Sequence, residues 1–137
     1  MSSKVVIGVI ALDRAAIWRK GIEPKTEPEH VSAFKDNAEY RDEREERASG
    51  RDRSVMDDGF LNDLVTYFSD AEHIILISAG SGKSNAGETF MDYLDKKHPS
   101  IAQNLIELLS ADVNKLTENE LLKMGRERWE LFAEVNK

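Results

Sequence analysis

The residues best suited to chemistry form one short segment, Gly80-Ser81-Gly82-Lys83-Ser84-Asn85. It follows the aliphatic run 74–77, and an amphipathic run begins directly after it. A strand that enters a glycine turn and then a helix directs backbone N–H groups and the positive end of the helix dipole toward one point. Such a point binds anions, so these six residues are the candidate phosphate site.

Two nucleotide-binding motifs resemble this segment, and it departs from both. A P-loop ends in Gly-Lys-Ser/Thr, as Gly82-Lys83-Ser84 does, but Ile77 stands where its first glycine belongs. The dinucleotide fingerprint is met at Gly80 and Gly82, but Asn85 replaces its third glycine. Of three interpretations, the pattern most favours a structural turn with a solvated Lys83. An anion site is the second choice, and a nucleotide triphosphatase is the third.

Two aspartates could join this segment in a reaction. Asp13 and Asp112 each follow an apolar run that could be a strand parallel to 73–78, which would place both beside Lys83 at one sheet edge. In an enzyme, either could be a general base or a metal ligand while Lys83 clamps the anion and Ser81 or Ser84 donates a hydrogen bond. No spacing supports this, and the pattern favours a turn-forming Asp13.

A second basic feature lies in the most charged stretch, residues 40–53. Arg41, Arg44 and Arg47 recur every three residues and could share a helical face that contacts phosphates. Acidic residues are interleaved with them, so a solvated helix or loop is favoured.

Composition limits the partners. The chain has 137 residues, of which 40% are hydrophobic and 33% charged, and its formal net charge is −7. An acidic surface repels nucleic acid on average, so RNA binding would require a local basic patch. The absence of cysteine excludes disulfides and thiolate chemistry. No cofactor or metal is indicated, because His30 has no second ligand at a helical or hairpin spacing.

No part of the sequence predicts a membrane span or a signal peptide. No run approaches the roughly 20 apolar residues that a span requires. Residues 1–4 lead directly into a strand-like run without a small-residue cleavage site. These features predict a cytoplasmic protein.

The hydrophobic pattern predicts the elements that position these residues. Buried runs indicate strands at 5–12, 15–19, 30–34 and 73–78, and residues 101–109 are a further strand or a short helix, with a strand favoured. Apolar residues at helical spacing, with caps, indicate helices at 57–69, 85–97 and 117–134. The order β-β-β-α-β-α-β-α predicts a single α/β domain with a mixed sheet over residues 1–137.

With these elements in place, the chain resembles a small bacterial member of the archaeo-eukaryotic peptide chain release factor group. More narrowly, it is similar to the C-terminal domain that those factors share with the ribosome-rescue protein pelota. Three parts of the sequence carry the similarity. Residues 11–18 match that domain's strand, Asp, small residues and second strand. The strand and glycine turn of residues 73–85 and the helix start at residues 116–122 also match. It implies a three-layer α/β/α sandwich related to kink-turn RNA-binding ribosomal proteins. The family's Gly-Gly-Gln tripeptide is missing, so peptidyl-tRNA hydrolysis is not expected.

Two functions follow from this reading. The first is a non-enzymatic binding module, associated with translation or the ribosome, that contacts a protein or ribonucleoprotein through the Gly80–Asn85 turn. The second is an enzyme or nucleotide-binding protein that acts on a phosphate-bearing substrate through Gly80–Ser84.

Overall fold

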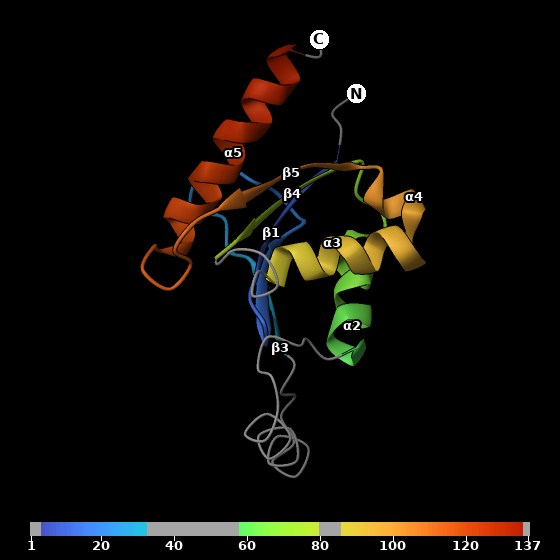
Figure 1. Ribbon diagram of the computed structural model, residues 1–137. Helices are drawn as coiled ribbons and strands as arrows, with labels where there is room; N and C mark the ends of the chain where they lie inside the picture. The colour runs from blue at the N-terminus through green and yellow to red at the C-terminus, as the bar shows by residue number, and fades with distance from the viewer. Residues whose placement is uncertain (1–3, 33–57, 80–85, 136–137) are drawn as a thin grey trace.

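The computed structural model describes residues 4–32, 58–79 and 86–135. Figure 1 shows a sheet with helices on both sides. The strands are β1 (Val5–Ile10), β2 (Arg14–Trp18), β3 (Glu29–Ser32), β4 (His73–Ser78) and β5 (Leu105–Ser110). The helices are α2 (Asp58–Phe68), α3 (Ala86–Lys97), the short α4 (Pro99–Ala102) and α5 (Glu118–Val135).

The described strands form one mixed sheet in the order β3-β2-β1-β4-β5. β1, β4 and β5 are parallel, whereas β2 is antiparallel to both β1 and β3. β1 and β4 lie at the centre with Ile7 beside Ile75, and helices cover both faces. This placement explains why both strands are almost continuously apolar.

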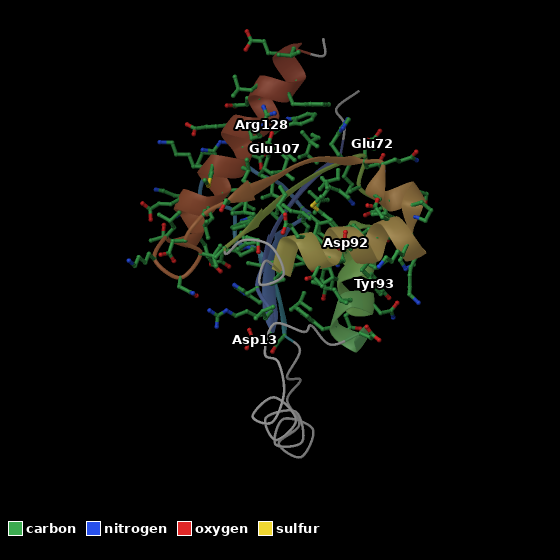
Figure 2. The ribbon with its side chains drawn as sticks, in the orientation of Figure 1. Asp13, Glu72, Asp92, Tyr93, Glu107 and Arg128 are labelled. Carbon is green, nitrogen blue, oxygen red and sulfur yellow. The ribbon has the colours of Figure 1, made fainter. Side chains whose placement is uncertain are left out.

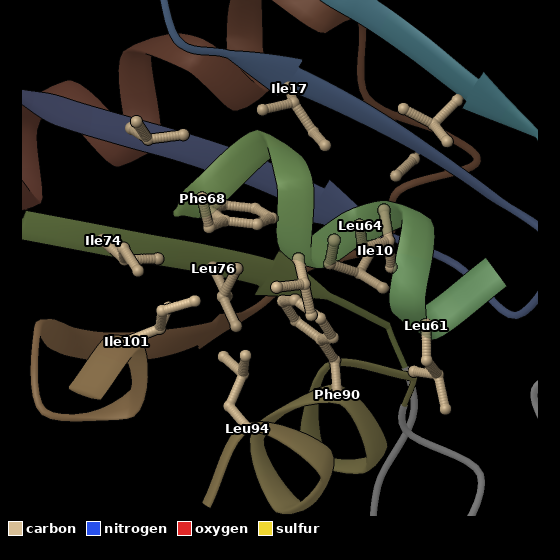
Figure 3. Close-up of a cluster of buried hydrophobic side chains, with 14 of the residues drawn as sticks. Ile10, Ile17, Leu61, Leu64, Phe68, Ile74, Leu76, Phe90, Leu94 and Ile101 are labelled. Carbon is tan, nitrogen blue, oxygen red and sulfur yellow. The ribbon is translucent and has the colours of Figure 1, made fainter. Parts of the chain in front are cut away.

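One face of the sheet is covered by α2 and α3. Ile74 and Leu76 of β4 point to this face, and the rings of Phe68 and Phe90 meet there with centroids 5.4 Å apart. Figure 3 shows α2 lying across the strands and α3 below it, with Phe90 and Leu94 of α3 pointing into the same cluster. The apolar stripes of the two helices are therefore buried in a single core.

The opposite face is covered by α5. Ile75 and Ile77, which alternate with the residues of the first core, pack here against Leu121 and Leu122. α5 approaches β1 closely at Gly125, where a Cβ atom would lie 2.9 Å from the side chain of Ile7. The result is an α/β/α sandwich with a mixed central sheet, which confirms the fold class predicted from the sequence.

The cap predicted for the last helix is present at the start of α5 as a capping box. The N–H of Glu120 donates to Thr117 Oγ1 at 3.1 Å, and the N–H of Thr117 donates to the Glu120 carboxylate at 2.8 Å. Two backbone donors that the helix leaves unpaired are satisfied reciprocally. Pro99 follows the end of α3 and opens a new helical turn, α4.

The prediction for residues 101–109 was only partly right. Ile101 and Ala102 belong to α4, and the strand begins at Leu105. Proline is well suited to the first position of a helix, so Pro99 extends helical backbone into the apolar run. The N–H groups of Gln103 and Asn104 then close the turn onto Pro99 and Ile101, and Asn104 Nδ2 donates to the Ala71 carbonyl.

Other boundaries differ by a few residues. β1 ends at Ile10 rather than at residue 12, because the N–H of Ala11 donates to the Arg14 carbonyl and closes the turn to β2. β3 begins at Glu29 and ends, as far as it is described, at Ser32. Within the described residues, no helix combines the length and hydropathy needed to cross a membrane.

Candidate functional site

The candidate site lies at the edge of the sheet where the parallel strands β1, β4 and β5 end. Because the three strands run in the same direction, the turn after Ile10, the segment after Ser78 and the loop after Ser110 all begin at this edge. We call it the carboxyl edge. Ligands of open α/β sheets bind at this kind of edge. Figure 2 shows Asp13 there and Glu72 at the opposite end of the sheet.

Ser78 organises the carboxyl edge. Its side chain is the one buried polar side chain among the described residues, with 1% of its surface exposed. Its hydroxyl donates to the Ile10 carbonyl at 2.8 Å and accepts from the N–H of Gly87 at 3.1 Å. Its own carbonyl accepts from the N–H of Ala111 at 3.1 Å. One residue therefore ties the ends of β1 and β5 to the first turn of α3.

A second contact joins the loops of this edge. Arg14 Nη2 donates to Asn114 Oδ1 at 3.0 Å, across 100 residues of sequence. This bond links the β1–β2 turn to the loop between β5 and α5. It holds an exposed guanidinium over the carboxyl edge, where it could also meet an anion.

Asp13 and Asp112 both lie at the carboxyl edge, as expected from parallel strands. Asp112 supports its own loop: its Oδ1 accepts from the N–H of Asn114 at 3.2 Å, and its Oδ2 lies 3.9 Å from Lys115 Nζ. Asp13 is half-buried in the β1–β2 turn and has no ion-pair partner within the described part of the chain. The shared edge is a fact of the fold, and a role for either carboxylate in binding stays a prediction.

The remaining predicted site residues lie outside the described ranges. These are Gly80, Ser81, Gly82, Lys83, Ser84 and Asn85 of the turn, and Arg41, Arg44 and Arg47 of the charged stretch. What the structure describes is the frame of the turn. β4 ends at Ser78 and α3 begins at Ala86, so the strand-to-helix order that an anion-binding turn requires is present.

A separate polar cluster lies at the other end of the sheet. The Arg19 guanidinium pairs with Glu29 and stacks over the ring of Tyr67, 4.7 Å from its centroid. The hydrogen bond from Arg19 lowers the pKa of Glu29, and the hydrogen bond from Lys4 lowers the pKa of Asp70. In each pair the two opposite charges neutralise each other, and the pairs join β2, β3 and α2. We therefore assign this cluster to stability.

The described residues offer no evident centre for a metal. In the ranges 4–32, 58–79 and 86–135, no three His, Asp or Glu side chains converge closely enough to hold an ion. His30 instead contacts Glu118, with Nε2 and Oε2 2.6 Å apart.

Comparison with known proteins yields a match in fold. No family model matches the sequence, and no curated protein matches it. Among solved structures, the chain is similar to Pelota from Archaeoglobus fulgidus, whose crystal structure revealed inter-domain structural plasticity. The TM-score is 0.59 at 13% sequence identity, over 99% of this chain and 35% of that one. The chain thus has a Pelota-like fold and spans about a third of the length of that protein.

Two features of the site were missed by sequence reasoning. The hydrophobic pattern marks Ser78 only as the last residue of an apolar strand. A small hydroxyl directly before a strand-to-helix turn, however, signals a side chain that can bond to both elements. The contact between Arg14 and Asn114 had no signal, because neither residue repeats a pattern and the two are joined only by the fold.

Proposed function

We propose that this chain is a non-enzymatic binding module that associates with a ribonucleoprotein of translation through the carboxyl edge of its sheet. Three observations support the proposal. The chain has a Pelota-like fold along almost its whole length. Its sequence resembles the partner-binding domain of the release factor and pelota group. It contains no Gly-Gly-Gln, the tripeptide to which the peptide-releasing chemistry of that group belongs.

The observation that carries the proposed location is the junction at Ser78. A hydroxyl that is bonded to both Ile10 and Gly87 fixes the first turn of α3 beside the end of β1. A fixed helix N-terminus presents its dipole in a constant direction, which favours an anionic group of a partner. We propose that Gly80–Asn85 make this contact, with Asp13 and Asp112 as accessory residues.

The charges at the edge suit one localised phosphate rather than a long nucleic-acid backbone. Arg14 and Lys115 are exposed there, but Asp13 and Asp112 lie in the same loops and offset them. The chain as a whole carries a formal charge of −7, which opposes extended contact with RNA. We propose that Arg41, Arg44 and Arg47 add positive charge for the same partner.

Co-sedimentation with ribosomes from the source organism tests this function. We expect the wild-type protein to pellet with ribosomes at low salt and to be released as salt rises, because screened charges contribute. Arg14→Ala, at the carboxyl edge, should reduce the pelleted fraction at least about threefold. Lys20→Ala removes an exposed charge just beyond the opposite end of β2 and should behave like the wild type. A wild-type protein that stays in the supernatant, or equal loss in both variants, would contradict the proposal.

The second proposal is an enzyme or nucleotide-binding protein that acts on a phosphate-bearing substrate through Gly80–Ser84. Its support is the shared edge of Asp13 and Asp112, where a general base could reach a bound phosphate. A thermal melt separates the two proposals. Specific stabilisation by ATP or GTP, but not by inorganic phosphate, favours this second function, because a ligand stabilises the native state in proportion to its binding.

A further inference from the structure

The two outer strands of the sheet differ in how they are protected. β3 has four described residues, and two of them, Glu29 and His30, carry polar side chains that are engaged with Arg19 and Glu118. Charged side chains on an edge strand resist pairing with other chains. β5 has six residues, Leu-Ile-Glu-Leu-Leu-Ser, and its one charged side chain is paired with Arg128. It lacks proline and lysine, two residues that block an edge, and its one irregularity is a shift of register with β4 between Leu105 and Glu107.

Among the described residues, no strand pairs with the outer side of β5, so its backbone presents N–H and C=O groups outward. The N–H of Ala111 donates to Ser78 on β4, and successive residues of a strand direct their N–H and C=O groups alternately to the two sides. Alternation therefore turns Leu109 and Glu107 toward β4, and Leu108 and Ser110 away from it. It does not extend to Ile106, where the register with β4 shifts. A row of outward donors and acceptors is the surface to which another strand adds.

Helix α5 leaves apolar side chains on the same side of the molecule. Contacts identify which long side of α5 faces which strand. On the β2 side, Arg126 Nη1 donates to the Ile22 carbonyl, beyond the end of β2. On the other side, the β5 border, Arg128 Nε donates to Glu107 on β5. Leu131 and Val135 follow Arg128 by three and seven residues and so lie on the β5 border. They are the two large hydrophobic side chains that are exposed among the described residues, at 56% and 82%. Figure 1 shows the last turns of α5, which carry them, extending beyond the sheet.

We propose that the outer edge of β5 and the β5 border of α5 form a two-fold interface between copies of this chain. An axis perpendicular to the sheet makes the two β5 strands antiparallel and keeps both α5 helices on the same face. The second helix then arrives on the side where Leu131 and Val135 are exposed. Self-complementary contacts of this type are the rule for homodimers.

The sequence of β5 also selects the register. The outward groups must face one another, so the axis passes through a residue rather than between two, and Glu107 and Leu108 are the residues nearest the middle of β5. An axis through Glu107 would oppose two carboxylates, which is destabilising. An axis through Leu108 places Leu108 opposite its counterpart and Glu107 opposite Leu109. This register brings the two Leu108 side chains together and leaves Glu107 paired with Arg128 in its own chain.

Sedimentation equilibrium of the full chain from about 1 μM to about 0.5 mM tests the interface. We expect the mass of two chains, and we expect Leu131→Gln with Val135→Gln to raise the dimer dissociation constant at least about tenfold. The matched control, Glu127→Gln with Glu134→Gln, changes exposed residues on the outer face of the same helix and should stay within about twofold. Ser110→Pro, which removes an outward N–H from an exposed residue, should weaken the dimer as well.

Circular dichroism of each variant verifies that the fold is retained. A wild-type chain that stays monomeric throughout this range would overturn the proposal. So would a dimer whose dissociation constant is unchanged in either the apolar-pair variant or Ser110→Pro.

Discussion

The hydroxyl of Ser78 accepts a hydrogen bond from the N–H of Gly87 at 3.1 Å, nine residues further along the chain. The same hydroxyl donates to the Ile10 carbonyl at 2.8 Å, so the end of the central strand, its parallel neighbour and the first turn of α3 share one buried atom. The segment between Ser78 and Gly87 contains the candidate anion-binding residues. Its two ends are therefore fixed relative to each other by a contact that depends on a single side chain.

Ser78→Ala should lower the free energy of unfolding by about 1–3 kcal/mol, because it leaves a buried carbonyl and a buried N–H without a partner. Urea denaturation measures the change. Ser69→Ala is the control, since the exposed Ser69 hydroxyl also donates to a backbone carbonyl, that of Thr66 at 3.1 Å. That control should stay within about 0.5 kcal/mol. Equal effects at the two positions would mean that the Ser78 contacts contribute no special stability.

Ile75→Ala or Ile77→Ala should destabilise the protein by about 2–5 kcal/mol, because each side chain is fully buried between the sheet and α5. Lys123→Ala removes a large side chain that is exposed on α5, and it should change stability by about 0.5 kcal/mol or less. Thermal and urea unfolding of the three variants provide the comparison. Wild-type stability in the β4 variants would be incompatible with a central position for this strand.

Stability should fall below about pH 4.5 through Glu29 and Asp70. Hydrogen bonds from Arg19 and Lys4 lower the pKa of these carboxyl groups from ordinary values of 4.5 and 3.8. A carboxyl group with a lowered folded-state pKa stabilises the protein fully above its unfolded-state pKa. That contribution is lost as the pH falls through the folded-state pKa.

Glu29→Gln and Asp70→Asn should therefore be less stable than the wild type at pH 7, and the difference should shrink toward pH 2. Melting temperatures across this range test the prediction. Asp92→Asn is the control, because Asp92 is exposed on α3 and has no ion-pair partner among the described residues. A difference from wild type that is independent of pH would show that these ion pairs do not contribute as stated.

Lys83→Ala should weaken phosphate binding by only a modest factor and reduce its salt dependence, because backbone donors carry an anion site and the lysine adds a screened charge. Lys96→Ala, at the opposite end of α3, should have no effect. Gly82→Val should abolish binding, because a branched side chain blocks the approach of an anion to the backbone. Phosphate titrations followed by NMR measure all three. Binding that survives in Gly82→Val would exclude Gly80–Asn85 as the site.

The sequence predicted those strands and helices whose hydrophobic pattern matches the faces that are buried in the structure. β1 and β4 are apolar along their length because helices cover both faces, and α2 and α5 show helical spacing because each buries one stripe. Residues 101–109 were assigned wrongly in part, because an apolar run has no period that separates a helical turn from a strand. The deciding feature there was Pro99 at the start of α4.

The site was less predictable than the fold. The parallel order of β1, β4 and β5 was inferred, and with it the shared edge of Asp13 and Asp112. The contact between Arg14 and Asn114 depends on how two loops meet, which spacing along the chain does not encode. Predictions for Gly80–Asn85 and for Arg41, Arg44 and Arg47 concern residues outside the described ranges, and they remain predictions.

Amide NMR of the labelled chain with purified ribosomal particles is the sharpest test of the proposed binding of a translation ribonucleoprotein at the carboxyl edge. We expect signals to broaden first at Arg14, Ala79, Gly87 and Asn114, all of which lie at this edge. Amides at the opposite edge, such as those of Glu72 and Asn104, should change last. Broadening that begins at the opposite edge, or spectra that the particles leave unchanged, would contradict the claim.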